Sequence, residues 1–164
     1  SPSEQSATPT ITTTPATVPP EVTTSSSPSN NPTPSTPAEV KVWAVVIGIA
    51  AYSHMPVLRY TDDDAYRMYA FLKSPEGGAL SDDQIRVLVD EDATKAKITE
   101  TMAEVFGQAG PNDLVLLYFS GHGLKGSFLP IDFDGYNNKL FHDEINTILS
   151  ESPAKYKLCI ADAW

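Results

Sequence analysis

Apolar residues recur along residues 40–164 in two alternating patterns. Continuous, β-branched runs such as VKVWAVVIGIA at 40–50 are typical of strands buried on both faces of a sheet. Similar runs predict strands at 85–90, 113–120 and 156–162. Between the runs, apolar residues recur at helical spacing and predict three helices. These helical stripes are Ala65, Met68, Tyr69 and Leu72, then Ile98, Met102, Val105 and Phe106, then Phe141, Ile145, Ile148 and Leu149.

The alternation of strands and helices predicts an α/β fold. Right-handed crossovers between successive strands give a mainly parallel central sheet with helices on both faces, which is a three-layer sandwich. From Glu39 onward, about 125 residues suffice for one ordinary domain. We therefore expect a single domain at 39–164.

Residues 1–38 have a different composition. They are almost entirely Ser, Thr and Pro and contain no Lys, Arg or aromatic residue. Such a segment cannot form a core, so we expect a disordered linker that is stiffened toward polyproline II. In bacteria, spacers of this kind often hold a domain away from a membrane or wall. We expect a passive spacer, an extracytoplasmic or membrane-tethered domain, and a signal peptide or anchor upstream, because the chain starts on Ser rather than Met.

Charge and cysteine content narrow the function. The chain has 11 basic and 21 acidic residues and a formal net charge of -10, with no basic block. Because phosphate binding needs clustered Lys and Arg, we expect no nucleic-acid partner, whereas an acidic domain suits cationic substrates. No apolar run is long enough to span a membrane. The lone Cys159 excludes an internal disulfide and a multi-cysteine metal site.

Two strand ends carry unusual residues. The run at 113–120 leads into SGHG at 120–123, and the run at 156–162 leads into Asp162, Ala163 and Trp164. In parallel α/β sheets, function gathers where strands end at their carboxyl side. Flanking glycines make His122 poor core material but permit close approach of another group to the backbone. A general base needs this placement, with a backbone N–H nearby to hold an oxyanion.

The pair YFSGHG and an apolar strand ending in DA resembles the caspase-fold cysteine peptidases, in particular the metacaspase and bacterial orthocaspase branch. The likeness covers 40–164, the large-subunit part of that fold. It implies a cysteine-type endopeptidase with a Cys-His dyad, whose second motif reads Asp-Ala-Cys. Here Trp164 stands at the nucleophile position, and the strands that complete the sheet would lie beyond it. We therefore expect a caspase-like fold that is incomplete at its C-terminus and a chain that, as given, cleaves nothing.

The resemblance also implies roles for single residues. His122 matches the catalytic base, the Gly123 N–H matches an oxyanion donor, and Trp164 marks the nucleophile position. The substrate pocket of metacaspases takes Arg or Lys at P1, the residue before the cleaved bond. Its lining matches Asp64, Asp162, Ser120 and Thr61. Two carboxylates in one pocket select a cation, so the expected partner is a peptide or protein substrate with a basic P1.

Simpler interpretations exist for each residue. Asp64 can stabilise a helix N-terminus, Asp162 can cap a following helix, and His122 can be a satisfied buried histidine. Cys159 lies inside an apolar strand and has a structural role as a small hydrophobe, while His54 and His142 are surface residues. Carboxylates in PIDFDG at 130–135 fit turn chemistry better than a calcium site, because the spacing is not that of an EF-hand. We expect no metal and no cofactor, and calcium enters only because metacaspases often depend on it.

Trp164 has three explanations, namely a protein that has lost its nucleophile, an error in the last residue, or a deliberate change. We favour the second, because the chain stops inside a motif. Three function classes follow. The first is the large-subunit part of an endopeptidase that cleaves after Arg or Lys, the second a catalytically dead caspase-fold module that binds peptides or partners, and the third an unrelated α/β binding domain.

Overall fold

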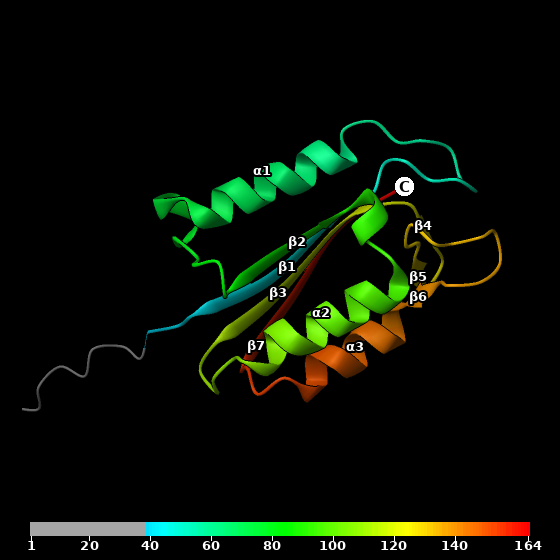
Figure 1. The fold of residues 1–164 in the computed structure, drawn as a ribbon. Coiled ribbons are helices and arrows are strands. Elements are labelled where there is room, and N and C mark those ends of the chain that lie inside the picture. Colours follow the sequence, from blue (N-terminus) through cyan, green and yellow to red (C-terminus); the bar gives the residue numbers. More distant parts are fainter. Residues whose placement is uncertain (1–38) are drawn as a thin grey trace, which may run out of the picture. The chain divides into compact units, whose positions relative to one another are not determined.

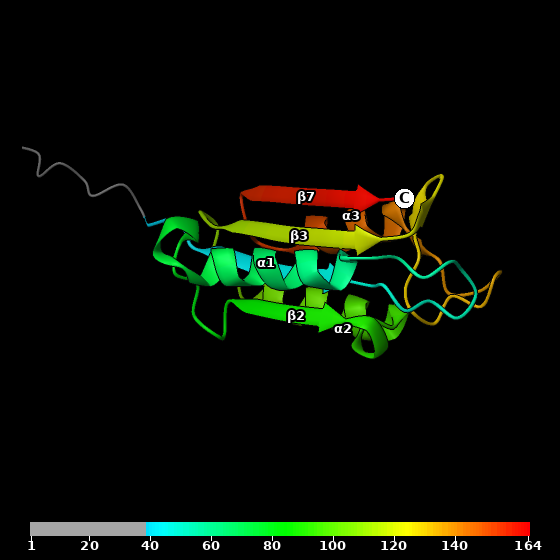
Figure 2. The same ribbon diagram turned by 90° about the horizontal axis from the view of Figure 1, so that it is seen from above.

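A computed structural model describes residues 39–164 of the protein. Four parallel strands form the central sheet, in the order β2-β1-β3-β7 (Figures 1 and 2). Their bounds are Val42–Gly48 for β1, Ile85–Val89 for β2, Leu114–Gly121 for β3 and Tyr156–Ala163 for β7. The predictions for the linker fall on residues 1–38, which lie outside the described residues, and stay predictions.

Helices cover both faces of this sheet. Helix α1 (Thr61–Lys73) lies on one face, while α2 (Lys95–Gly107) and α3 (His142–Glu151) lie on the other (Figure 1). Short 3-10 turns follow α1 at Pro75–Gly77 (η1) and β2 at Asp90–Asp92 (η2). The predicted α/β class, with a parallel central sheet between helical layers, is confirmed.

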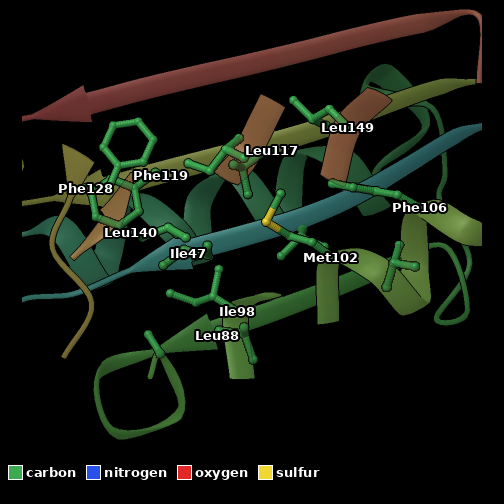
Figure 3. Close-up of a cluster of buried hydrophobic side chains, with 14 of the residues drawn as sticks. Ile47, Leu88, Ile98, Met102, Phe106, Leu117, Phe119, Phe128, Leu140 and Leu149 are labelled. Carbon is green, nitrogen blue, oxygen red and sulfur yellow. The ribbon is translucent and has the colours of Figure 1, made fainter. Parts of the chain in front are cut away.

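Two buried clusters hold the layers together. Figure 3 shows the larger one, where Ile47 and Leu117 of the sheet meet Ile98, Met102 and Phe106 of α2. Burying one such side chain contributes about 1.5–3 kcal/mol. The smaller cluster lies under α1 and includes Val46, Ala65, Leu72, Leu116 and Tyr118. Strands β1 and β3 are therefore packed on both faces, which gives their carboxyl ends a rigid base.

A buried carboxylate fixes the start of β3. Asp113 accepts hydrogen bonds from the Trp43 indole Nε1–H at 3.0 Å, the Gly110 N–H at 2.7 Å and the Lys41 N–H at 3.1 Å. Burial opposes ionisation of this carboxyl, but the three donors outweigh burial and lower its pKa. Asp113 thus ties β1 to the turn that precedes β3.

Strand β7 differs from the prediction for its residues. The apolar run predicted burial, and Cys159 was interpreted as a structural core residue. All eight residues of β7 are exposed instead, with Leu158 at 44% and Ile160 at 38%, because β7 is an edge strand paired only with β3 in the described part of the chain. An apolar run does not distinguish an edge strand from a central one. Cys159 is correspondingly exposed, although partial desolvation raises the pKa of its thiol.

A second, three-stranded antiparallel sheet was not predicted. It consists of β4 (Gly123–Leu124), β5 (Ser127–Phe128) and β6 (Leu140–Phe141). Two-residue strands are too short to show a periodic pattern. Phe141 was predicted to belong to the buried stripe of α3, but it precedes the helix and is half exposed. Its N–H donates to the Glu144 carboxylate at 2.9 Å, a capping contact that starts α3.

Helices long and apolar enough to cross a membrane do not occur within residues 39–164.

Candidate active site

The carboxyl ends of β3 and β7, which carry the two motifs, lie side by side. Ser120 pairs with Asp162 and Gly121 with Ala163 in a parallel register. The ladder continues one step further, since the Trp164 N–H donates to the Gly121 carbonyl at 3.1 Å. His122 therefore lies next to Trp164, the position to which the resemblance assigns the nucleophile.

The His122 imidazole is held in one orientation. Its side chain is buried, its Nε2 lies 2.7 Å from the Pro56 carbonyl oxygen, and its Nδ1 lies 3.4 Å from the Trp164 carbonyl oxygen. A carbonyl oxygen only accepts, so the close Pro56 contact places the proton on Nε2. Nδ1 faces the backbone carbonyl oxygen of Trp164 at the longer distance of 3.4 Å, so in a neutral imidazole with its proton on Nε2 the Nδ1 lone pair is directed at residue 164. A general base for a nucleophile at that position needs this arrangement.

The Gly123 N–H, to which the resemblance assigns the role of an oxyanion donor, already makes a hydrogen bond. It donates to the Trp164 carbonyl at 3.0 Å. A Cβ at Gly123 would lie 3.0 Å from the Ala163 Cβ, so the glycine permits the close approach of the two strand ends. Holding an oxyanion would require the bond to Trp164 to open.

A pocket of about 460 Å³ opens beside Trp164. It brings together Asp64 from α1 and Asp162 from β7, the two carboxylates that the resemblance assigned to one pocket. The full lining is Leu58, Arg59, Tyr60, Thr61, Asp64, Arg67, Asp162 and Trp164. Tyr60, at φ 72°, has a left-handed backbone conformation just before α1, and its carbonyl accepts the Asp64 N–H at 2.7 Å.

Charges of both signs surround this pocket. Burial raises the pKa of the Tyr118 hydroxyl, and the nearby carboxylates of Asp64 and Asp162 raise it further. The negative charges of Asp64 and Asp162 therefore both reach Tyr118 on β3. Arg67 approaches Asp64, with its Nη1 3.8 Å from the Asp64 Oδ1, and its side chain is largely exposed. Such an exposed ion pair contributes little to stability.

The two neutral residues of the expected pocket differ in their contacts. Thr61 lines the pocket, is buried, and donates its hydroxyl to the Ile49 carbonyl at 2.7 Å. Ser120 is fully buried and is not among the lining residues. Its hydroxyl has no hydrogen-bond partner among the described residues. The register with Asp162 nevertheless puts Ser120 on the pocket's side of the sheet.

His54, His142 and the carboxylates of PIDFDG are not among the residues that line this pocket. His54 and His142 are exposed, and the His142 ring packs against Phe128 at 4.6 Å between centroids. In PIDFDG, Asp132 accepts the Lys95 N–H at the start of α2. Asp134 accepts bonds from the turn that follows it, and the Asn137 donors lower its pKa to about 2. Within 39–164 no group of His, Cys, Asp or Glu side chains is arranged to hold a metal ion.

Sequence reasoning missed the loop that surrounds His122. Tyr52 and Pro56 lie in the segment between β1 and α1, and both contact this histidine. Their role depends on a backbone carbonyl and on a contact across the fold, which no local pattern reveals. Arg59 and Arg67 at the pocket were also not singled out.

The central parallel sheet between two helical layers is consistent with a caspase-like fold. The family model described as a caspase domain matches residues 41–163, and the chain belongs to this family.

Similar proteins agree with this assignment. The chain is 29% identical over 125 residues to metacaspase-1 from two strains of Saccharomyces cerevisiae, an alignment that covers 65% of this chain. It spans only 28% of the length of those yeast proteins. A crystal structure of a Geobacter sulfurreducens protein matches the fold with a TM-score of 0.56 at 21% identity, covering 75% of this chain and 50% of that one.

Proposed function

We propose that this domain is the large-subunit part of a cysteine endopeptidase that cleaves proteins after Arg or Lys. The observation that carries the proposal is the position of His122, whose Nδ1 faces the backbone of residue 164 at the end of β7 while its Nε2 contacts the Pro56 carbonyl. A thiol at position 164 would lose its proton to Nδ1 and attack the scissile carbonyl carbon. The same proton would then pass from His122 to the leaving amine as the peptide bond breaks.

The preference for a basic P1 rests on the pocket beside residue 164. Asp64 and Asp162 both line it, so a guanidinium or ammonium group could pair with two carboxylates there. An Asp side chain would meet like charge from the same two groups. Arg59 and Arg67 also line the pocket, but Arg67 is largely exposed and can move into solvent.

Trp164 makes the chain as given inactive under this proposal. An indole cannot act as a nucleophile toward a peptide carbonyl, and its side chain is 73% exposed rather than packed. The Gly123 N–H donates to the backbone carbonyl of residue 164, a bond that does not depend on the indole and would have to open in an active enzyme as well. Activity would need a thiol at position 164.

The test is a cleavage assay of the Trp164→Cys protein, expressed from the gene together with any coding region downstream of residue 164. The product should hydrolyse fluorogenic peptides with Arg or Lys at P1 and leave matched peptides with Asp or Leu intact. The parent with Trp164 serves as the control and should be inactive. Preferential cleavage after Asp, or equal cleavage after all four residues, would reject the proposed specificity.

A catalytically dead module that binds peptides is the second candidate, favoured by the tryptophan at the nucleophile position. It shares the fold and the acidic pocket but not the chemistry. In that case the parent chain would bind an Arg-containing peptide, and Trp164→Cys would not produce cleavage.

A further inference from the structure

The loop between β1 and α1 encloses His122 on two sides. Tyr52, which is 5% exposed, lies in this loop and accepts the His122 backbone N–H on its hydroxyl oxygen at 2.9 Å. The same hydroxyl donates to the Leu129 carbonyl at 2.7 Å. The two aromatic rings lie 4.8 Å apart and are tilted by 58°. From the other side, the Pro56 carbonyl accepts from the imidazole Nε2.

The glycine before His122 is required by this contact. A Cβ at Gly121 would lie 2.6 Å from the Tyr52 hydroxyl oxygen, which is too close for any side chain. The first glycine of SGHG therefore makes room for Tyr52, whereas the second permits the approach of Ala163. Both glycines thus serve contacts that fix the histidine between them.

The base of the loop is also fixed. Asp90 accepts the N–H groups of Ala50 and Ala51 at 2.8 and 3.0 Å through one carboxylate oxygen. Asp90 itself has a left-handed backbone conformation, with φ 48°, at the end of β2. Burial, with a smaller effect of the Asp90 charge, raises the pKa of Tyr52, so its hydroxyl stays protonated and continues to donate to Leu129.

We propose that Tyr52 is a positioning residue that holds His122 in the orientation and tautomer a general base needs. The positioning of His122 by Tyr52 is argued from contacts alone, and only its effect on catalysis rests on the proposed function. The hydroxyl secures the backbone of His122, and the ring packs against the imidazole. With the main chain and one ring face fixed, Nε2 stays directed at Pro56 and Nδ1 at residue 164.

The first test uses the chain as given, with Trp164, and needs no activity. Long-range proton–nitrogen correlation spectra at pH 8 should show His122 as a single tautomer protonated on Nε2, while the exposed His54 and His142 show mixtures. Tyr52→Phe keeps the ring and removes the hydroxyl. It should speed hydrogen exchange of the His122 amide by about tenfold or more and mix its tautomers.

Tyr136→Phe is the matched control, because Tyr136 is 82% exposed and far less constrained. It should change neither measurement. A mixture of His122 tautomers in the parent chain would overturn the proposal, even if Tyr52→Phe failed to fold. Unchanged exchange and an unchanged tautomer in a folded Tyr52→Phe protein would overturn it as well.

The second test separates positioning from the proposed catalysis. In an active Trp164→Cys protein, Tyr52→Phe should lower kcat by about 10- to 100-fold and leave KM nearly unchanged, because a misplaced base slows chemistry rather than binding. A loss confined to KM would contradict a positioning role. If Trp164→Cys is inactive, the proposed function fails, and the spectra of the parent chain still decide the role of Tyr52.

Discussion

The Nε2 atom of His122 lies 2.7 Å from the carbonyl oxygen of Pro56, a residue of the loop before α1. This contact assigns the imidazole proton to the side away from residue 164. The remaining nitrogen, Nδ1, faces the backbone of Trp164 at the end of β7. A thiol introduced at 164 would therefore meet an acceptor rather than a donor, and its reactivity can be measured without any substrate.

Trp164→Cys should create a fast-reacting thiol beside the slow native one. A thiol next to a free imidazole ionises more readily, whereas desolvation raises the pKa of Cys159 and keeps it protonated near neutral pH. Labelling with a thiol reagent at pH 7 should show two phases in Trp164→Cys and one slow phase in the parent. The Cys159 phase should accelerate only in more alkaline solution than an ordinary thiol needs, because burial raises the pKa of this thiol.

Two further variants assign the phases. Cys159→Ser in the Trp164→Cys background should remove only the slow phase, and His122→Ala should abolish the fast one without unfolding the domain. A fast phase that survives His122→Ala would show that the imidazole does not activate position 164.

Removing the charge of Asp64 should weaken cleavage after Arg. Asp64 lines the pocket beside residue 164, and a hydrogen bond to a charged group contributes about 1.5–3 kcal/mol. In an active Trp164→Cys protein, Asp64→Asn should lower kcat/KM for Arg peptides by roughly 10- to 100-fold. Asp63→Asn is the control, because Asp63 is exposed on the same helical turn and does not line the pocket. Equal effects of the two variants would mean that the charge stabilises α1 rather than the substrate.

Gly48→Ala should destabilise the domain and disturb the pocket. A Cβ at Gly48 would lie 2.6 Å from the Thr61 carbonyl oxygen and 2.5 Å from the Ala65 Cβ, both at the start of α1. Overpacking of this kind typically costs about 1–3 kcal/mol. Urea unfolding measures the loss. Gly107→Ala, at the end of α2 with no atom within 4 Å of the added Cβ, should be neutral or slightly stabilising. Similar stability of the two variants would show that α1 can move away from β1 at no cost.

The sequence predicted the sheet and its three helices because their apolar periods are long and regular. The β1 and β3 runs are buried on both faces, as such runs indicate. The same pattern failed for β7, because burial of an edge strand depends on what pairs with its outer side. The small sheet of β4, β5 and β6 was missed because its strands have two residues each.

The sequence likewise predicted some residues of the candidate site and not others. Motifs at strand ends pointed to His122 and Asp162, and the resemblance added Asp64. The fold brings Asp64 to the same pocket as Asp162, whereas His122 does not line that pocket. Tyr52 and Pro56 could not be found this way, because they act on His122 through a hydroxyl and a backbone carbonyl from a loop without a motif. Gly121 and Gly123 gave a partial signal, since glycines at a strand exit indicate close approach without naming the group that approaches.

Acid should remove the stability that Asp113 provides. Its folded-state pKa is lowered, so its contribution is fully present above the unfolded pKa of about 3.9 and is lost as pH falls through the lower, folded value. Asp113→Asn cannot ionise and offers one acceptor oxygen to three donors, from Lys41, Trp43 and Gly110. Leaving a buried donor unpaired costs about 1–3 kcal/mol, so this variant should be less stable at pH 7 by that amount.

The difference in unfolding free energy between the parent and Asp113→Asn should shrink as the pH falls. Protonation of Asp113 in the parent removes the same interactions that the substitution removes. Urea unfolding of parent and variant at pH 7, 5 and 3 measures the gap directly. Asp63→Asn, on an exposed carboxylate, should show little gap at any of these pH values. A gap between parent and Asp113→Asn that stayed constant down to pH 3 would mean that the substitution acts through its shape and not through the loss of charge.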